Sequence, residues 1–539
     1  MNARSKPVYV IGSGPAGLAA AHALVDQGVE VVMLDVGLDL EPEREQLINE
    51  MYAQEPSGWS PGHIEELKRG MRATTDGIPQ KLTYGSDFPF RDAGQAGAVE
   101  ASGVDFLLSG AKGGLSNAWG SNIMPYASRD ISDWCISTAD LAPHYTAVAT
   151  FIPVSAGHDD LEDDFPLYGG NGTMLRPSRQ AENLIRNVCR NKEVLKADGI
   201  RGGYARLAVQ ISPTEENRRA CVYCGLCLYG CPYRLIYSSR NGLKSLERRP
   251  NFRYQPGIVI DSVKEEAGGV TVYGRSVEGG TPITFVGSRV YLACGAIATT
   301  RVLLESMQAY DTPVTLKDSL YFLLPTLQYD CVPGVTNEAL HSLGQVLLEM
   351  QDRAISERTV QLQYYTYTDL FTEAVRSRLG ILFPLARGLL PILLGRLCIV
   401  MGYLHSDDSP SLSIQLMRQG SGSKLALEAI PSPRARPVIK GVMGKLWRHR
   451  SRLRSLPLSP FLKVMRPGKS YHYGGTFPMK AAPGRFESDR LGRPAGFRRV
   501  HAVDASVLPS IAATTIVFTA MANAHRIASA YEQCEASTS

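Results

Sequence analysis

Four cysteines stand close together near the middle of the chain, in the stretch CVYCGLCLYGCPY. They are Cys221, Cys224, Cys227 and Cys231, and Pro232 directly follows the last one. This C-x2-C-x2-C-x3-C-P spacing is the one with which bacterial ferredoxins bind an iron–sulfur cluster through thiolates. The spacing therefore predicts a 4Fe-4S or 3Fe-4S cluster, which would pass electrons one at a time to a redox partner protein.

Other uses of the four cysteines stay open at this point. Zinc is less favoured because structural zinc sites usually divide their ligands into two separated pairs. Disulfides are less favoured because the start of the chain shows no apolar signal region and no twin arginine, which predicts a reducing, cytoplasmic location. The remaining alternative is that the four cysteines are reduced thiols with only a structural role. If the run supplies only three ligands, the fourth is Cys231 in a relaxed geometry or a remote thiol of Cys135, Cys189, Cys294, Cys331 or Cys398.

A second constellation lies near the start of the chain, in VYVIGSGPAGLAAAHALVDQGVEVVMLD. An apolar run predicts a buried strand, a G-x-G-x-x-G turn follows, and a helix and a second strand come next. The glycines let the backbone approach a pyrophosphate at the helix N-terminus. Asp35 ends the second strand, where its carboxylate can accept from a ribose 2′-hydroxyl, so the segment predicts FAD or NAD rather than NADP. The cofactor-binding candidates in the turn are Gly12, Gly14, Pro15, Ala16 and Gly17.

Three more pieces follow in order: GAKGGLSNAWGSNIMP (110–125), VYLACGAIATTRVLLES (290–306), and a closing block that begins at KSYHYGGTFPM. With the glycine turn, they make the chain resemble the glucose–methanol–choline (GMC) oxidoreductases, and they frame nearly its whole length. The resemblance implies an FAD enzyme that oxidises an alcohol by hydride transfer to flavin. It also implies further cofactor-binding positions, namely Gly113, Gly114, Ser116, Asn117, Val259, Gly295, Asp504 and Ala505.

The resemblance also implies a catalytic base. The family places a histidine two residues before a Gly-Thr pair, and His472-x-x-Gly475-Thr476 matches that pattern. An imidazole with a pKa near 6.5 can take the hydroxyl proton of the substrate as hydride leaves. Relatives carry His or Asn at a second position, where this chain has Ala513. A methyl group cannot replace either residue, so we expect Thr514 to substitute or a group from elsewhere to assist.

The order of these pieces predicts an α/β protein with a discontinuous, Rossmann-like FAD-binding domain and an α+β substrate domain that contains an antiparallel sheet. The stretch RTVQLQYYTYTDL alternates like a strand of that sheet, with one face available to a pocket. The expected divisions are 1–130 (FAD-binding), 131–204 (substrate or cap segment), 205–310 (FAD-binding, with the cysteines), 311–468 (substrate domain) and 469–539 (FAD-binding, with the histidine).

An apolar stretch and a basic stretch stand out inside the expected substrate domain. Residues 379–405 approach a membrane span in length, but two arginines and two prolines interrupt them, so we expect a lid or core element or an interfacial surface. Residues 432–470 hold eleven Lys and Arg and no acid, within a chain of net charge +5. A solvated helix face is the ordinary explanation, and a peripheral contact of 379–454 with an anionic membrane is the alternative. Nucleic acid is not expected, because no binding motif accompanies the charge.

Taken together, these features predict an FAD-dependent alcohol dehydrogenase that acts on a small-molecule or lipid-linked alcohol. Its electrons would leave through the cysteine cluster. One alternative is an oxygen-using oxidase with structural cysteines. Another is a flavin electron-transfer subunit without a substrate of its own, which the alanine at position 513 suggests.

Overall fold

A parallel sheet joins the two ends of the chain. The computed structural model describes residues 6–72, 80–95, 97–170, 172–386, 388–420 and 422–536. The sheet has five strands, all parallel, in the order β22 (Val500–Ala502), β11 (Arg289–Leu292), β1 (Val8–Ile11), β2 (Val31–Leu34) and β7 (Phe252–Gln255). β1 is buried along its whole length, as the apolar sequence of a central parallel strand requires.

Helices and a small antiparallel sheet pack around this sheet. α1 (Pro15–Asp26) packs against α14 (Ile516–Ser529), and α14 in turn contacts α4 (Thr138–Val148). The alanines of α1 make its buried surface small and allow this close approach. α8 (Ala296–Ser306) contacts a three-stranded antiparallel sheet beside it. That sheet consists of β8 (Ile258–Glu266), β9 (Gly269–Ser276) and β10 (Pro282–Gly287), while α7 (Ser239–Glu247) packs on α1 and α15 (Tyr531–Ala536) on α14.

Two larger sheets form the rest of the molecule. One has five strands in the order β21 (Tyr473–Gly474), β12 (Pro313–Asp318), β17 (Ser411–Gln419), β18 (Gly422–Ile430) and β5 (Ala98–Ser102). The other has seven antiparallel strands, with β19 (Ser455–Pro457), β13 (Tyr321–Gln328), β16 (Leu397–Tyr403), β15 (Val360–Tyr365), β14 (Val346–Met350) and β6 (Ile200–Tyr204) in order and β20 (Lys463–Val464) also on β13. The predicted mixed architecture, a Rossmann-like unit and a separate antiparallel sheet, is confirmed.

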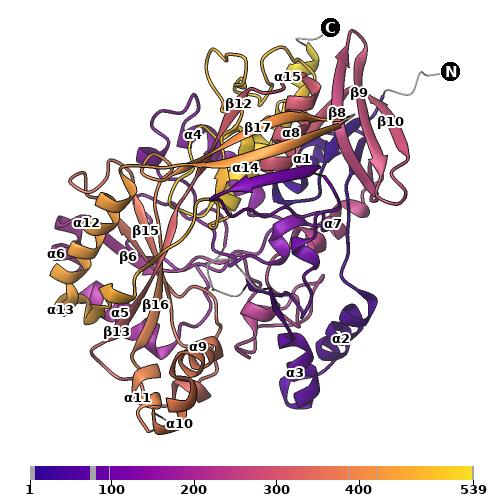
Figure 1. Cartoon of the computed structure of the whole chain (residues 1–539). Helices are drawn as coiled ribbons and strands as arrows, with labels where there is room; N and C mark the ends of the chain where they lie inside the picture. Colours follow the sequence, from indigo (N-terminus) through magenta and orange to yellow (C-terminus); the bar gives the residue numbers. More distant parts are fainter. Residues whose placement is uncertain are drawn as a thin grey trace.

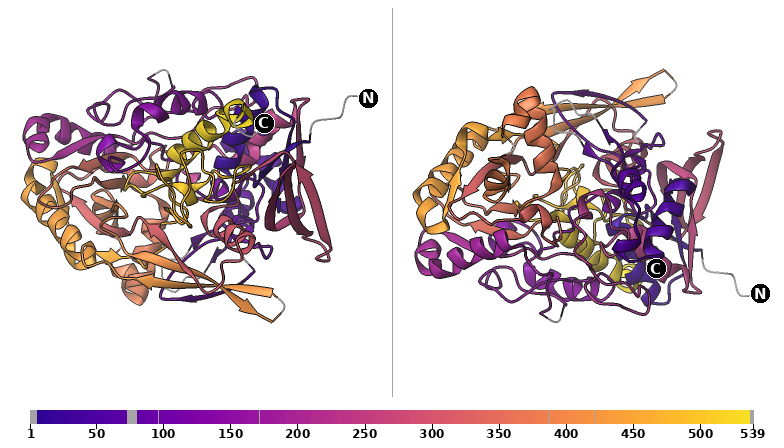
Figure 2. Two further views of the ribbon diagram at one scale, coloured as in Figure 1. Left: turned by 90° about the horizontal axis from the view of Figure 1, so that it is seen from above. Right: turned by 90° about the horizontal axis from the view of Figure 1, so that it is seen from below.

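The seven-stranded sheet carries its own helical layer. Figures 1 and 2 show this layer at the end of the molecule away from the parallel sheet. Its apolar side chains share one core with the strands. The helices are α5 (Arg179–Arg190), α6 (Lys192–Ala197), α12 (Ala435–Arg448) and α13 (Arg450–Leu453). The basic stretch thus contains α12, whose apolar face lies in the core, with Val438, Val442 and Leu446 buried.

The apolar stretch 379–405 is not one helix. It contains the end of α9 (Asp369–Leu379), the short helices α10 (Phe383–Ala386) and α11 (Leu390–Leu394), and then β16 in the seven-stranded sheet. Ile381, Leu389 and Ile392 expose much of their side chains. In the part of the chain that the structure describes, no helix is both long and apolar enough to cross a bilayer. The membrane contact of 379–454 stays a prediction.

The remaining elements form a lobe beside the parallel sheet. It contains α2 (Pro42–Ala53), α3 (Pro61–Lys68), β3 (Met71–Arg72) and β4 (Gln80–Lys81). In Figure 1, α2 and α3 project from the lower right of the molecule. The apolar side chains of α2 and α3 share a core with the cysteine loop, which places Cys221, Cys227 and Cys231 beside this lobe.

Candidate functional site

One cavity of about 430 Å³ connects the glycine turn with His472. It begins at the carboxyl ends of the parallel strands, where α/β folds place their ligands. It ends against the seven-stranded sheet. Most of the predicted cofactor-binding residues line it, namely Gly12, Gly14, Pro15, Ala16, Asp35, Gly114, Ser116, Gly295, Asp504 and Ala505.

The turn after β1 is built so that the backbone itself forms the cavity wall. Gly12 has φ +101°, and a Cβ there would lie 2.5 Å from the carbonyl oxygen of Ala293. A Cβ on Gly17 would lie 1.9 Å from the carbonyl oxygen of Gly12. Both positions therefore require glycine. Gly17 does not line the cavity, and its role is to let α1 approach the turn.

Three helices begin at this cavity. The residues that precede them are Gly14 for α1, Gly295 for α8 and Thr515 for α14. Within the described chain, none of these three residues caps its helix with a side-chain hydrogen bond. The first backbone N–H groups of each helix are therefore free to bind an anionic or carbonyl-bearing ligand in the cavity.

Asp35 closes the cavity at the end of β2. Its Oδ2 accepts hydrogen bonds from the hydroxyl of Ser13 and, at 2.9 Å, from the hydroxyl of Tyr254. The same Ser13 hydroxyl oxygen accepts from the backbone N–H of Gly113 at 2.8 Å. Gly113 thus links its loop to the first turn and does not line the cavity. Burial raises the pKa of Asp35 to about 6.

Asp504 holds the start of α8. Its Oδ2 accepts from the N–H of Gly295 at 2.9 Å and from the hydroxyl of Thr299 at 2.5 Å. Its Oδ1 accepts from the N–H of Ser506 at 2.9 Å. Asp504 therefore joins the C-terminal block of the chain to the segment that follows β11, and it fixes the cavity wall between them.

His472 lies at the other end of the cavity, directly before β21. Its ring stacks on Tyr403, with 5.2 Å between the ring centres and 21° between the planes. Its Nδ1 is buried and has no hydrogen-bond partner among the described residues. Burial lowers the pKa of His472 to about 4, so the ring is neutral at pH 7. A neutral imidazole keeps a lone pair that can accept a proton.

Asp318 holds the backbone around His472. Its carboxylate accepts from the N–H of Gly468 at 2.8 Å and from the hydroxyl of Ser470 at 2.9 Å. The Ser470 hydroxyl oxygen accepts from the N–H of His472 at 3.0 Å. Tyr471, between them, has φ +59°, which is strained for a side chain of its size. The bonds to Asp318 hold this strained turn in place.

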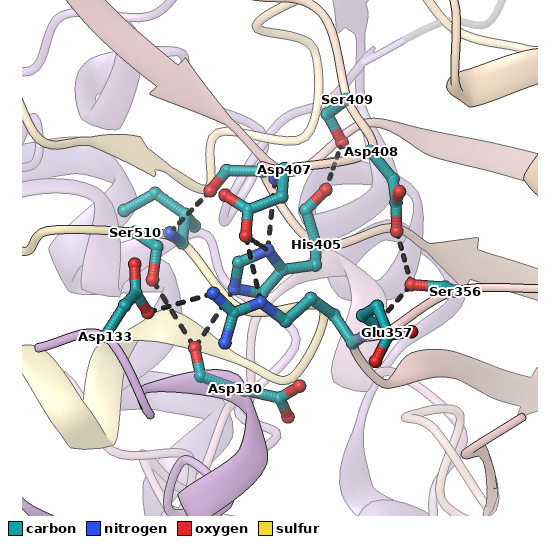
Figure 3. Close-up of polar contacts among 12 residues, drawn as sticks. Asp130, Asp133, Ser356, Glu357, His405, Asp407, Asp408, Ser409 and Ser510 are labelled. Carbon is teal, nitrogen blue, oxygen red and sulfur yellow. Dashed lines mark hydrogen bonds and ion pairs between the residues drawn. The ribbon is translucent and has the colours of Figure 1, made fainter. Parts of the chain in front are cut away.

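The loop before α14 is fixed by a buried polar network around His405 (Figure 3). The Nδ1 of His405 accepts from the N–H of Asp407 at 3.0 Å, so its Nε2 carries the proton and donates to the carbonyl oxygen of Asp130 at 3.2 Å. The hydroxyl of Ser510 donates to the same oxygen at 3.4 Å. His405 does not line the cavity. Its neighbour Ser406 holds the segment that leads to Ala513, because its N–H donates to the carbonyl oxygen of Ile511 at 2.8 Å and its hydroxyl oxygen accepts from the N–H of Ile511 at 3.0 Å.

The second catalytic position is filled differently from the expectation. Ala513 is buried against Tyr321, Tyr403 and Met465. Of the two threonines that follow, Thr515 lines the cavity and Thr514 does not. The predicted substitution by Thr514 thus finds no support, because the loop directs its neighbour into the cavity. The hydroxyl oxygen of Thr515 accepts from the N–H of Met124 at 3.2 Å.

Two other cofactor-binding predictions are also displaced. Val259 is buried away from the cavity, whereas Ile258 and Ile260 on the same strand line it. Side chains alternate along a strand, so a shift of one residue exchanges the two faces. Asn117 uses its Nδ2 to donate to the carbonyl oxygens of Lys112 and Gly114, at 2.9 and 2.7 Å, and so holds its own loop together.

Sequence analysis missed the polar and aromatic groups that line the His472 end of the cavity. They are Asn122, Tyr321, Gln363, Tyr365 and Tyr403. One signal was visible. Gln361 and Gln363 are two residues apart on a predicted strand, so they share one face of a mostly apolar segment.

The cysteine stretch is a loop outside the cavity. It contains the short 3-10 helix Cys227–Tyr229, and the nine cysteines that the structure describes are all free thiols. The ring of Tyr84 packs against Gly230, and its hydroxyl donates to the carbonyl oxygen of Cys231 at 3.2 Å. Burial raises the pKa values of Cys221, Cys227 and Cys231.

No group of three or more His, Cys, Asp or Glu side chains within the described ranges could hold a metal ion. The predicted iron–sulfur cluster therefore has no support in the geometry of the described residues.

Comparisons with known proteins also indicate that the chain binds FAD. A family model described as an FAD binding domain matches residues 5–41. The 6'''-hydroxyparomomycin C oxidase of Streptomyces lividus is 27% identical over 327 residues, which is 56% of this chain and 50% of that protein. The match thus spans about half the length of the curated relative. The crystal structure of pyridoxine 4-oxidase from Mesorbium loti has a TM-score of 0.59 at 13% identity, over 98% of this chain and 99% of that chain. The chain is an FAD-binding protein with the fold of that oxidase.

Proposed function

We propose that the protein is a GMC-type, FAD-dependent oxidoreductase that oxidises a CH–OH group of a small molecule. The observation that carries this proposal is the position of His472, a neutral and unpartnered imidazole in the same cavity as the dinucleotide turn. The two named relatives are both oxidases of small molecules, which supports the same class.

The residues of the cavity fit FAD. The backbone at Gly12 and Gly14 would lie against the pyrophosphate, and Asp35 would bind the ribose. The free N–H groups at the start of α14 and the backbone that follows Gly295 would contact the flavin. When bound, FAD supplies a two-electron acceptor for hydride. The chain itself supplies the proton acceptor, the walls that exclude water, and the groups that orient the alcohol.

In this proposal His472 takes the hydroxyl proton as the C–H bond of the same carbon breaks. Stacking on Tyr403 fixes the plane of the ring, and Asp318 fixes the backbone through Ser470. Because the ring is neutral above about pH 4, a nitrogen lone pair is available over the whole physiological range. Ala513 leaves the aromatic wall without a second histidine or asparagine.

We assign dioxygen as the electron acceptor, which makes the protein an oxidase. Electron exit through an iron–sulfur cluster is the alternative that the cysteine spacing predicts, and the arrangement of the thiols does not favour it. Hydrogen peroxide formed in equal amount to oxidised alcohol would support the oxidase. Iron and acid-labile sulfide in stoichiometric amounts would support the alternative.

The test is anaerobic reduction of the bound flavin by a panel of alcohols, followed at the flavin absorbance band. We expect at least one alcohol to bleach the flavin and His472→Ala to abolish the bleaching. If no alcohol bleaches the flavin, the protein is better described as an electron-transfer subunit without a substrate of its own.

A further inference from the structure

The end of the cavity that contains His472 is formed by one face of the seven-stranded sheet. Met401 and Tyr403 of β16 line the cavity, and so do Gln363 and Tyr365 of the neighbouring β15. In each strand the two residues are two positions apart, so their side chains leave the sheet on the same face. The side chain of Tyr403 therefore lies on the cavity side of the sheet.

Two aromatic rings stack on the ring of Tyr403. The ring centre of Tyr321 is 5.6 Å away with 23° between the planes, and that of His472 is 5.2 Å away with 21° between the planes. Only 6% of Tyr403 is exposed. Stacking occupies the faces of a ring, so the edge, which carries the hydroxyl, is the part of Tyr403 that remains to contact a ligand in the cavity.

The hydroxyl of Tyr403 is a donor without an acceptor from the protein. Within the described part of the chain it makes no hydrogen bond, and burial raises its pKa well above the ordinary value. The hydroxyl therefore keeps its proton over the whole physiological range. A buried tyrosine hydroxyl usually has a partner, and an oxygen atom of a ligand in the cavity would supply one.

Tyr403 also stands in front of the position where sequence analysis expected a second catalytic group. Ala513 is fully buried in one cluster with Tyr321, Tyr403 and Met465, and it does not line the cavity. The tyrosine, rather than residue 513, is thus the group that meets the cavity beside His472. Because the two rings are neighbours and nearly parallel, one substrate oxygen can lie within reach of both ring edges.

We propose that Tyr403 is a second catalytic residue, whose hydroxyl donates a hydrogen bond to the alcohol oxygen while His472 takes the proton of that oxygen. As the O–H bond breaks, the proton goes to His472. The electron pair of the C–H bond leaves as hydride for FAD, and the carbon becomes a carbonyl carbon. Negative charge develops on the oxygen during this step, and the Tyr403 hydroxyl stabilises it without losing its own proton. This inference rests on the proposed function.

The experiment removes single hydroxyl groups from the FAD-loaded protein. Tyr403→Phe keeps the ring and its stacking but loses the donor. Tyr364→Phe is the matched control, because Tyr364 lies in the core on the opposite face of the same sheet. Thr515→Val tests a rival donor, since Thr515 also lines the cavity. Benzyl alcohol, cyclohexylmethanol and D-glucose are the probes for anaerobic bleaching. Benzoate and toluene, which differ in having an oxygen acceptor, are the binding probes, and perturbation of the flavin absorbance reports their binding.

With the alcohol that bleaches the parent fastest, we expect Tyr403→Phe to slow flavin reduction about 100-fold, as loss of one preorganised donor predicts. The half-saturating alcohol concentration should change by less than about threefold, because the bond strengthens only as charge develops. Benzoate should bind Tyr403→Phe about tenfold more weakly than the parent, whereas toluene should bind both equally. Tyr364→Phe should behave as the parent, and Thr515→Val should lose less of the rate than Tyr403→Phe.

Reduction of Tyr403→Phe within about threefold of the parent rate would overturn the inference and leave the proposed function standing. A rate loss in Thr515→Val as large as that in Tyr403→Phe would also overturn it. Loss of FAD from Tyr403→Phe, or equal weakening of benzoate and toluene, would do the same, because either result indicates a structural role. Failure of benzoate to bind the parent would overturn it as well. If benzoate binding weakens as expected but no alcohol bleaches the parent, Tyr403 stands as the donor to a bound oxygen and the proposed function fails.

Discussion

The cavity and the cysteine loop are the two regions in which this chain gathers groups capable of redox or acid–base chemistry. In the cavity, the ring of His472 is neutral at pH 7, and its Nδ1 has no hydrogen-bond partner among the described residues. In the cysteine loop, Tyr84 packs on the turn, and burial raises the pKa of the Cys231 thiol. The cysteine loop has the more specific sequence motif, whereas the cavity has the arrangement of side chains that better supports chemistry. Spacing shows which groups are near one another, whereas reactivity depends on which of their atoms remain free.

The largest expected effect tests the catalytic side of this contrast. His472→Ala removes the proton acceptor, and we expect flavin reduction by alcohol to slow by about 10²–10⁴-fold. Anaerobic stopped-flow absorbance measures this rate. His158→Ala, which changes an exposed histidine beside Glu162, is the control and should reduce at the parent rate. A slowing of less than about tenfold in His472→Ala would place the base elsewhere.

A smaller effect is expected from the residue that holds His472 in place. Asp318→Ala frees the turn that contains Tyr471, and we expect about a 10–100-fold loss of the reduction rate, since small misplacements have such effects. Asp318→Asn can still accept from the N–H of Gly468 and should retain most of the rate. FAD content, read from the absorbance ratio, should stay near the parent level in both. Equal rates in Asp318→Ala and the parent would contradict the positioning role.

The pH dependence of stability gives a third, more moderate effect. Burial raises the pKa of Asp35 to about 6, of Asp318 to about 7 and of Glu349 to about 8. The unfolded chain has values near 4, so between pH 4 and 8 the folded state binds more protons. Stability is therefore full below about pH 4 for these groups and is lost as the pH rises.

Buried histidines whose pKa values are lowered to about 4 oppose this trend up to about pH 6.5, so we expect the Tm of the FAD-free protein to fall between pH 7 and pH 8, as measured by calorimetry. Glu349→Gln cannot ionise, so its Tm should fall less over the same range. A Tm that rises with pH in the parent, or an identical slope in the variant, would show that these carboxyl groups are solvated.

The smallest effect is expected in the cysteine loop. Cys224 is exposed, and Cys224→Ser should leave FAD content, reduction rate and Tm within experimental error. The matched change Cys227→Ser, at a more enclosed thiol, should lower the free energy of unfolding by about 1 kcal/mol and leave the rate unchanged. Metal analysis should find iron well below one atom per chain. Loss of a visible chromophore in Cys224→Ser would restore the cluster as a redox centre.

Much of the fold could be predicted from the sequence, because its signals are local. The glycine turn, Asp35 and the C-terminal block each indicate one part of a cofactor site. They follow one another in the order that the family shows, which implies that they meet in the folded protein. The structure brings Gly14, Asp35, Gly295 and His472 to one cavity.

The rest of the site depends on contacts that local sequence does not contain. Val259 and Thr514 do not line the cavity although their sequence neighbours do, because periodicity gives the alternation of faces but not which face meets the ligand. Asn122 and Gln363 meet across 241 positions of sequence. Their polar side chains were visible in the sequence, but only the paired strands show that they continue a hydrogen-bonded row that begins at Glu349.

The parallel sheet pairs strands that are far apart in the sequence, which has a consequence for biosynthesis. β1 pairs with β11, and β11 pairs with β22, so the sheet is incomplete until the ribosome has passed residue 502. Most of the chain must emerge before the cofactor cradle closes, and such distant pairings fold slowly. Until then the glycine turn and α1 lack a neighbour on one side. We expect nascent chains to need protection by chaperones, and FAD to be taken up only after the last strand has docked.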